Sequence, residues 1–454
     1  MLPQGLIQSL KHLVGFDENA FKAVHNNDEI LTSIRKNAFK NAPLSFENTT
    51  PIDWCTQGLY LEKRPSFVFD PLWHAGAYYV QEASSMFLWH ICHCLFGENT
   101  KQLVLDLCAA PGGKSTLLSD YFYDGLIISN EVIKPRAAIL EENITKWGNG
   151  NVVITCNDAE YFKPLGNLFD AVFVDAPCSG SGLFRKDKDA IQEWSENNVE
   201  LCSQRQKRII GNIITTLKLD GYLIYSTCSY SQQENEDVVD WIMDNFEVEN
   251  IAIPLDENWG IVASSSFKHQ AMGYRFYPYL TKGEGFFVSV FKKKNGSKNS
   301  TFKLLKNKKI ISATKNETTI SSLYLQSPNN YNFIKHNEDV IAISKFWEQT
   351  FEWLAQHLYI KKIGTIIGQI KHNEVVPAHD IAMSTKKAKS IVTIEVDKEA
   401  AIKYLQKKDI QLAFNVKGWV LLSYCEVSIG FVKVLPNRIN NYYPKEWRIL
   451  KDYF

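Results

Sequence analysis

Two cysteines that follow apolar segments have the clearest potential for chemistry in this chain. Cys178 comes after the apolar run 169–175, and Cys228 comes after the run 221–226. Such runs are typical of buried strands in a parallel sheet, and ligands of these sheets bind beyond the carboxyl ends of the strands. We therefore expect both thiols in one crevice. A single cysteine is more often a small buried apolar residue, so their joint placement is what favours a catalytic role.

Nucleophilic catalysis is the chemistry that best fits two thiols at this place. A thiolate can add to C6 of a pyrimidine, which makes C5 electron-rich enough to accept a methyl group. Free thiols have a pKa of about 8.5, and a positive neighbour such as Lys114 is expected to lower this pKa. No metal is expected, because none of the ten histidines lies in these loops. The residues alone leave open which cysteine attacks.

A glycine-rich turn over 108–114 joins the apolar run 103–107 to a helical pattern that carries Leu117, Leu118 and Tyr121. This combination predicts a strand, a tight turn and a helix. Glycines in such a turn let a ligand approach the backbone near the helix N-terminus. The sequence therefore predicts a nucleotide-binding loop, and the alternative is a tight turn that binds nothing.

The identity of the nucleotide follows from what this loop lacks. A P-loop needs a glycine five positions before Gly113, where Cys108 stands, and a dinucleotide fingerprint needs G-x-G-x-x-G, which is absent. Glu131, after the apolar run 126–130, is suited to bind ribose hydroxyls. S-adenosylmethionine is the nucleoside that remains.

The composition is that of an ordinary globular protein. The 454 residues are 45% hydrophobic and 22% charged, and they contain no apolar run of the roughly eighteen residues that a membrane span needs. The first residues lack the basic start and long apolar core of a signal peptide. Nine cysteines show no repeated pairing pattern. We expect a cytoplasmic protein with free thiols and no membrane partner.

The net charge is zero, but lysines concentrate in one segment. Residues 292–315 contain nine lysines and no acidic residue. Like charges at this density either contact an anionic partner such as RNA or form a solvated linker, and the segment alone favours neither.

Strand and helix signals alternate over 102–292, which is the signature of a doubly wound parallel sheet in an α/β fold. A small α+β preface of about ninety residues comes before this core. The end of the chain alternates apolar and polar positions and predicts a small β-rich module. The expected parts are 1–95, 96–292, 293–395 and 396–454. The expected helices of the core include 198–217 and 235–246, and its expected strands are 103–107, 126–130, 152–155, 169–175, 221–226 and 285–291.

Three motifs in this core resemble those of the RNA 5-methylcytosine methyltransferases of the NOL1/NOP2/Sun group. They are Cys-Ala-Ala-Pro-Gly-Gly-Lys at 108–114, Asp-Ala-Pro-Cys-Ser-Gly at 175–180 and Ser-Thr-Cys-Ser-Tyr at 226–230. The preface is also similar, and the tail from Gly418 to Arg448 looks like the PUA-like module of the bacterial RsmF-like branch. One departure is Ala38, where the family often has proline.

The resemblance implies a Rossmann-like class I methyltransferase sheet with a role for each matching residue. Cys228 would be the nucleophile, and Cys178 would assist release of the methylated RNA. Asp175 and Lys114 would hold the edge of the cytosine. The S-adenosylmethionine site would be lined by Cys108, Ala109, Ala110, Pro111, Gly112, Gly113, Lys114, Glu131, Asp158 and Asp175.

The resemblance also implies an RNA partner, which would be 16S ribosomal RNA in the small subunit or its precursor. The target base must leave a stacked helix before a thiol can reach it. Six cationic and aromatic residues of the tail suit phosphates and base stacking, although a role in the core of the module is equally expected for the aromatic ones. His379 is expected to be a structural histidine with satisfied hydrogen bonds. The six cationic and aromatic residues of the tail are Arg438, Tyr442, Tyr443, Lys445, Trp447 and Arg448.

The favoured function is methylation of C5 of a cytosine in 16S ribosomal RNA by a monomeric enzyme through a covalent Cys–C6 adduct. The same chemistry on transfer RNA is one alternative. A non-catalytic ribosome assembly factor with the same fold is another, and the presence of both Cys178 and Cys228 argues against it.

Overall fold

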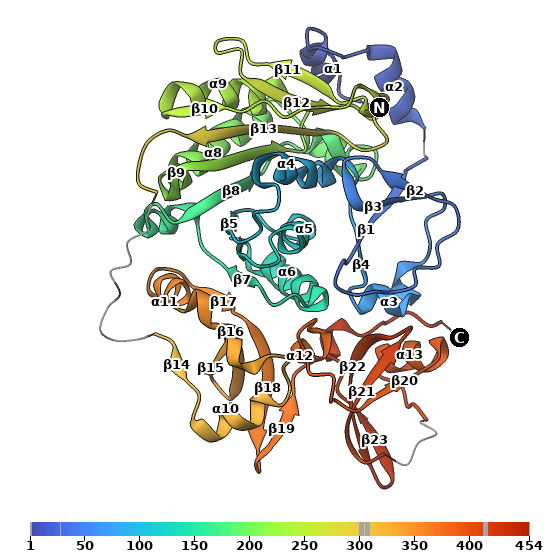
Figure 1. Ribbon diagram of the computed structural model, residues 1–454. Coiled ribbons are helices and arrows are strands. Elements are labelled where there is room, and N and C mark those ends of the chain that lie inside the picture. The colour runs from blue at the N-terminus through green and yellow to red at the C-terminus, as the bar shows by residue number, and fades with distance from the viewer. Residues whose placement is uncertain (1, 28, 299–303, 305–308, 412–415, 454) are drawn as a thin grey trace.

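The computed structural model describes the chain except residues 1, 28, 299–303, 305–308, 412–415 and 454. A central sheet is joined by a small N-terminal sheet and by two C-terminal sheets (Figure 1). Of the nine lysines in the segment 292–315, Lys303, Lys306 and Lys308 lie outside the described residues, and the expectation for the segment stays a prediction. Among the described ones, Lys292 and Lys298 pair with Asp220, and Lys294 pairs with Glu249. In the part of the chain that the structure describes, no helix is long and apolar enough to cross a membrane.

The central sheet has the strand order β11-β12-β13-β9-β8-β5-β6-β7-β17, with β10 paired to β13. Strands β9, β8, β5, β6 and β7 run parallel, and the others pair antiparallel. The doubly wound α/β sheet expected from the sequence is confirmed. The bounds are β5 Leu103–Asp106, β6 Leu126–Asn130, β7 Val152–Thr155, β8 Phe169–Asp175, β9 Leu217–Thr227, β10 Val248–Asn250, β11 Val262–Ser265, β12 Met272–Phe276, β13 Phe286–Lys293 and β17 Ile360–Lys362.

Helices cover both faces of this sheet because successive residues of its strands point to opposite sides. Leu105 packs in one core with Ile210 and Ile213 of α8, whereas Val104 packs in the other with Leu117 of α5. The first face carries α8 (Glu196–Ile213), α9 (Glu236–Asn245) and α11 (Glu348–His357), and the second carries α4 (Phe87–Phe96), α5 (Gly113–Tyr121) and α6 (Lys134–Trp147).

The boundary between α8 and β9 differs from the expectation. The predicted helix through residue 217 ends at Ile213, because Leu217 pairs with Phe169 and begins β9. The hydroxyl of Thr216 donates to the carbonyl oxygen of Ile213 at 2.7 Å and closes the turn between them. Tertiary pairing therefore overrides the helical pattern here.

The N-terminal residues form three helices, α1 (Gln4–Leu10), α2 (Glu18–Asn26) and α3 (Pro71–His74), and a four-stranded antiparallel sheet in the order β2-β3-β1-β4. Leu6 and Leu10 of α1 pack against Tyr230, which follows β9. The preface is thereby anchored beside the loop that carries Cys228. The strand bounds are β1 Thr32–Lys36, β2 Thr49–Ile52, β3 Cys55–Leu61 and β4 Tyr78–Val80.

The C-terminal part has a five-stranded sheet, β14-β15-β16-β18-β19, and a four-stranded sheet, β20-β21-β22-β23 (Figure 1). The second sheet begins with β20, three residues before residue 396, where the sequence placed the boundary. The bounds are β14 Ile311–Ser312, β15 Tyr331–His336, β16 Asp339–Ser344, β18 Thr365–Lys371, β19 Glu374–Pro377, β20 Thr393–Glu395, β21 Gly418–Tyr424, β22 Val427–Leu435 and β23 Arg438–Asn441, with helices α10 Lys315–Ser322, α12 His379–Met383 and α13 Lys398–Leu405.

Of the two alternatives for the aromatic residues of the tail, Tyr443 takes the core role, and the expectation for His379 needs correction. Tyr443 is a core residue, because it is 1% exposed and its ring packs against Tyr404 and His379, so it offers no face to RNA. His379 is structural as expected, but it is not satisfied. Neither of its ring nitrogens has a hydrogen-bond partner among the described residues.

Candidate functional site

The site lies where the strand order of the central sheet reverses. Strand β5 is flanked by β6 on one side and by β8 on the other. The chain first adds β6 and β7 on one side of β5 and then crosses over to add β8 and β9 on the other side. In open α/β sheets, ligands bind in the crevice outside the carboxyl ends of the strands at such a point. The loops after β5, β6, β7, β8 and β9 all end at this edge.

Asp106 supports the glycine-rich loop after β5 through a hydrogen bond. This buried carboxylate accepts a hydrogen bond from the hydroxyl of Ser115 in α5 at 2.7 Å, and burial raises the pKa of Asp106 to about 7. Gly112 has a φ of +118°, and a Cβ at this position would lie 3.2 Å from Leu140. The turn therefore requires glycine at this position.

A cavity of about 360 Å³ opens beside this loop. Its size and its mixed polar and apolar lining suit a nucleoside. Of the residues expected around S-adenosylmethionine, Cys108, Glu131 and Asp158 line it, whereas Ala109 to Lys114 and Asp175 do not. The lining residues are Leu107, Cys108, Asn130, Glu131, Val132, Ile133, Arg136, Asn157, Asp158, Ala159, Pro177, Arg205, Arg208 and Ile209.

The two carboxylates of the cavity differ in their partners. Glu131 is buried and accepts the backbone N–H of Ile133 at 2.9 Å, with Arg136 at 3.6 Å from its other oxygen. Asp158 forms two hydrogen bonds with Arg208 at 3.1 and 3.2 Å, and this guanidinium lowers the pKa of Asp158. One oxygen of Glu131 therefore has only the Arg136 guanidinium near it, at a distance longer than a hydrogen bond, whereas both oxygens of Asp158 accept hydrogen bonds from Arg208.

The sulfur atoms of Cys178 and Cys228 lie 3.0 Å apart, and both are free thiols. The hydrogen bond with Cys228, together with burial, holds the pKa of Cys178 well above its ordinary value. The expectation that Lys114 lowers the pKa of a thiol here is therefore wrong for Cys178. Cys178 keeps its proton near neutral pH, and its S–H can donate to the sulfur of Cys228.

Lys114 and Asp175 form an ion pair across the same crevice. The Nζ atom of Lys114 lies 2.7 Å from Oδ2 of Asp175, and the hydroxyl of Ser226 donates to Oδ1 at 3.0 Å. Burial disfavours the charged amine, but the carboxylates of Asp175 and Asp106 outweigh it and raise the pKa of Lys114. The pair therefore presents a fixed donor and a fixed acceptor at the ends of β5 and β8.

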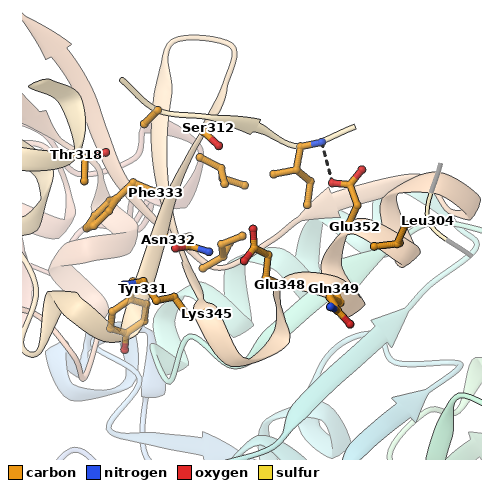
Figure 2. A pocket seen from close by; sticks show the side chains of 14 residues that line it. Leu304, Ser312, Thr318, Tyr331, Asn332, Phe333, Lys345, Glu348, Gln349 and Glu352 are labelled. Atoms are coloured by element: carbon orange, nitrogen blue, oxygen red, sulfur yellow. Dashed lines mark hydrogen bonds between the residues drawn. The ribbon is translucent and has the colours of Figure 1, made fainter. Parts of the chain in front are cut away.

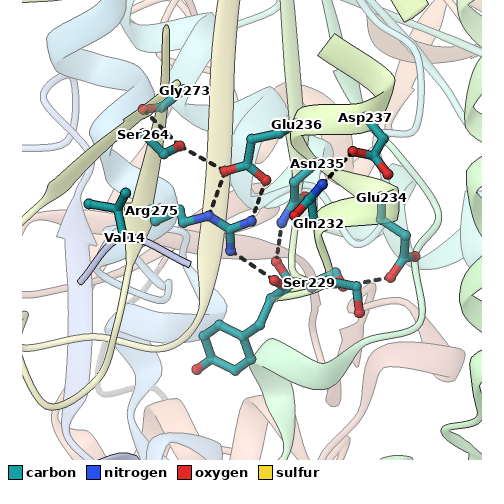
Figure 3. Close-up of polar contacts among 12 residues, drawn as sticks. Val14, Ser229, Gln232, Glu234, Asn235, Glu236, Asp237, Ser264, Gly273 and Arg275 are labelled. Atoms are coloured by element: carbon teal, nitrogen blue, oxygen red, sulfur yellow. Dashed lines mark hydrogen bonds and ion pairs between the residues drawn. The ribbon is translucent and has the colours of Figure 1, made fainter. Parts of the chain in front are cut away.

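The loop that carries Cys228 is fixed by a buried polar network (Figure 3). The amide of Asn235 donates to the carbonyl oxygen of Ser229 at 2.8 Å, and its Oδ1 accepts from Thr227 at 2.6 Å. Behind it, Arg275 of β12 pairs with Glu236 and donates to the carbonyl oxygen of Tyr230 at 2.8 Å. Both residues that flank the cysteine are therefore tied to the body of the domain, which limits movement of its thiol.

Two residues of the site, Asn130 and Arg208, were not among those expected from the sequence. Asn130 donates to the carbonyl oxygens of Leu107 and Asn157 and so joins three strand ends, and Arg208 reaches the cavity from α8. The position of Asn130 directly before Glu131 was a usable signal for the first. Arg208 lies within a helix with no motif, so its contact with Asp158 depends on the packing of α8.

A larger cavity, of about 630 Å³, lies in the C-terminal part, between β14, β15, β16 and α11 (Figure 2). Glu348 and Glu352 of α11 and Asn332 of β15 contribute to its wall. It includes no residue from the loops at the carboxyl ends of β5 to β9, so we do not assign the chemistry to it.

Family models match three segments of the chain. The model for the 16S rRNA methyltransferase RsmB/F matches residues 94–292. The N-terminal domain of 16S rRNA methyltransferase RsmF matches residues 2–83, and the methyltransferase RsmF PUA domain matches residues 391–449.

Relatives are similar over most of the chain. The ribosomal RNA small subunit methyltransferase F of Psychromonas ingrahamii is 32% identical over 415 residues, which cover 87% of this chain and 85% of the relative. The protein of the same name from Shewanella piezotolerans is 30% identical over 424 residues, covering 88% and 85%.

Solved structures share the fold of about two thirds of the chain. A methyltransferase homolog protein from Pyrococcus horikoshii is 26% identical and covers 64% of this chain and all of that chain, with a TM-score of 0.53. NSun6 from the same organism also has a TM-score of 0.53, with 19% identity, and covers 64% of this chain and 98% of its own.

Proposed function

The chain belongs to the RsmF branch of the 16S rRNA methyltransferase RsmB/F family, and we propose that it transfers a methyl group from S-adenosylmethionine to C5 of a cytosine in 16S ribosomal RNA. The observation that carries this proposal is the 3.0 Å contact between the sulfurs of Cys178 and Cys228 at the switch point of the sheet. It supports a covalent mechanism, because such a pair supplies a nucleophile and a proton carrier side by side.

The cavity beside the loop after β5 fits S-adenosylmethionine. Glu131 offers a buried carboxylate at the end of β6, where ribose hydroxyls bind in such folds, and Asp158 at the end of β7 is proposed to face the adenine amine. When bound, S-adenosylmethionine supplies the electrophilic methyl group.

Each of four side chains then has a proposed task on the cytosine. The thiolate of Cys228 adds to C6 of the ring. Lys114 and Asp175 hold the edge of the base through their fixed donor and acceptor. Cys178 keeps its proton before attack. After methyl transfer it releases that proton to solvent, and its thiolate accepts the proton of C5. The C5–H electron pair then forms the C5=C6 bond, the C6–S bond breaks, and Cys228 leaves as a thiolate, which frees the RNA. The RNA must present this base outside a stacked helix.

The finer parts of the proposal concern the partner and the place of action. The names of the relatives support 16S ribosomal RNA, in the small subunit or its precursor, over transfer RNA. We propose that the enzyme acts as a monomer in the cytoplasm, where small subunits are assembled. Bisulfite mapping of total RNA from cells with and without the gene identifies the methylated cytosine, and a change confined to transfer RNA would contradict the proposed substrate.

Two single variants test the chemistry. Cys178→Ala retains the nucleophile but not the release step, so it is expected to methylate once and to stay bound to RNA through a denaturing gel. Cys228→Ala is expected to form no adduct and no product, and the double variant should also lose the trapped complex. Trapping by Cys228→Ala alone would exchange the two roles, and trapping by neither would argue against the covalent step. Circular dichroism melts show whether each variant is folded.

A further inference from the structure

Glu234 is a fully buried carboxylate behind the two cysteines, in the short helix η6 (Gln232–Glu234). Its Oε1 accepts the backbone N–H of Ser179 at 2.7 Å and the amide of Gln206 at 3.3 Å. Its Oε2 accepts the hydroxyls of Ser179 at 2.5 Å and of Ser229 at 2.6 Å. Four donors therefore surround this one side chain and favour its charged form, although burial outweighs them and raises the pKa of Glu234 above its ordinary value.

Three of these four hydrogen bonds come from the immediate neighbours of the cysteines. Ser179 follows Cys178 in the loop after β8, and Ser229 follows Cys228 in the loop after β9. The bond between Glu234 and Ser229 is visible beside the Asn235 network in Figure 3. Two loops that leave different strands are thus tied to the same carboxylate, one residue beyond each thiol.

This connection has a geometric consequence for the thiols. The two sulfurs lie 3.0 Å apart, although both cysteines are free thiols and no covalent bond joins them. Reacting groups must be held to within a fraction of an ångström, and a misplacement of about 1 Å can cost about a hundredfold in rate. A shared anchor behind both loops satisfies that requirement.

Building on the methyl transfer proposed above, we propose that Glu234 is the positioning residue of the cysteine pair and holds both thiols against one pyrimidine ring. The negative charge of Glu234 also affects the protonation of Cys178. Together with the hydrogen bond that Cys178 donates to Cys228 and with burial, the charge of Glu234 raises the pKa of Cys178, which keeps that thiol protonated while Cys228 attacks. Glu234 does not line the cofactor cavity, so its effect is expected on the chemical step and not on cofactor binding.

Three variants of the full-length enzyme test this role. Glu234→Ala removes all four bonds. Glu234→Gln keeps the shape and one acceptor oxygen, so it is expected to retain the tie to Ser179 N–H and to rescue part of the effect. Asp237→Asn is the matched control, because Asp237 is a neighbouring carboxylate that accepts from Gln232 at 2.8 Å and forms no hydrogen bond with Ser179 or Ser229 among the described contacts.

The first measurement does not depend on methyl transfer. Diamide oxidises two neighbouring thiols to a disulfide and is itself reduced, and mass spectrometry of the non-reduced protein measures the Cys178–Cys228 cross-link over time. We expect cross-linking to be about tenfold slower in Glu234→Ala, intermediate in Glu234→Gln and unchanged in Asp237→Asn. An unchanged rate in a folded Glu234 variant would overturn the proposal, and if Glu234→Ala does not fold, the glutamine variant decides.

The second measurement separates positioning from a purely structural role. Single-turnover methyl transfer to 16S ribosomal RNA is expected to fall about a hundredfold in Glu234→Ala, with KM for S-adenosylmethionine changed less than about twofold. A normal rate in this variant would also overturn the proposal. If the wild-type protein transfers no methyl group but its cross-linking depends on Glu234, the proposed function fails while Glu234 still holds the thiols in position.

Discussion

Arg35 of β1 connects the N-terminal sheet to the cofactor loop, and its replacement by methionine is a sharp test of that connection. The guanidinium is fully buried and lies 2.8 Å from Oδ2 of Asp120 in α5. It also donates to the hydroxyl of Thr116 at 2.6 Å and to the amide oxygen of Gln81 at 2.9 Å. Arg35→Met keeps most of the volume and removes the charge, so Asp120 is left buried with the indole N–H of Trp147 and the backbone N–H of Ala38 as donors and no cation.

The size of the effect follows from the burial of both partners. Breaking a buried ion pair by removal of one partner costs about 3–5 kcal/mol. Burial already raises the pKa of Asp120 to about 6, and the loss of Arg35 must raise that pKa further. Above pH 6 the folded variant therefore holds a proton that the wild-type and unfolded chains have released, so its stability falls as pH rises. The deficit should grow by about 1.4 kcal/mol per pH unit from pH 6 to pH 8.

Urea unfolding at pH 6, 7 and 8, followed by tryptophan fluorescence, measures this deficit. The double variant Arg35→Met with Asp120→Asn removes the titrating group and keeps an acceptor for Trp147, so it should recover part of the stability and lose the pH dependence. A loss below about 1 kcal/mol at pH 8, or a deficit that is the same at all three pH values, would refute the reasoning.

Three further predictions concern single residues. Glu131→Ala should weaken S-adenosylmethionine binding at least about tenfold by calorimetry, as expected for a charged hydrogen-bond acceptor, and unchanged affinity would remove Glu131 from the site. Burial lowers the pKa of His379 to about 3, below its unfolded value, so stability present above pH 6.5 is lost on acidification. Between pH 7 and 5 this loss is about 2 kcal/mol, and His379→Leu should abolish it in urea unfolding. Iodoacetamide should label Cys178 slowly at pH 8, because its pKa is raised, and rapid labelling there would contradict the protonated state.

The arrangement of the central sheet could be predicted because its signals are local. Each parallel strand is a short apolar run, and each ends at a residue that breaks the run, such as Asp175 or Thr227. The end of α6 at Gly148, with a φ of +79°, follows from the same kind of local rule. Once strands and helices alternate, the crevice at their carboxyl ends follows from the topology, and so does the convergence of Cys178 and Cys228.

The supporting residues could not be predicted, because their partners are distant in the sequence. Glu234 lies 55 positions from Ser179, and Arg35 lies 85 positions from Asp120. Strand β17 joins the central sheet from the C-terminal part through a short antiparallel pairing with β7, and nothing in its three residues predicts that partner. Tyr443 shows the same limit, since an aromatic residue beside cations has the same pattern in a core as on an RNA-binding face.

The residues at strand ends and the supporting residues have different roles in the site: the first supply the reactive groups, and the second hold them in position. Residues at strand ends, such as Cys228, are displayed to the crevice by the sheet itself, so a motif of a few residues is sufficient to specify them. The distance between two such residues is a different matter, because the loops that carry them leave separate strands. That distance depends on a group that reaches both loops from behind, and in this chain the described contacts of Glu234 do so. An intact pair of cysteine motifs therefore specifies the reagents, whereas the 3.0 Å contact between them depends on the buried carboxylate.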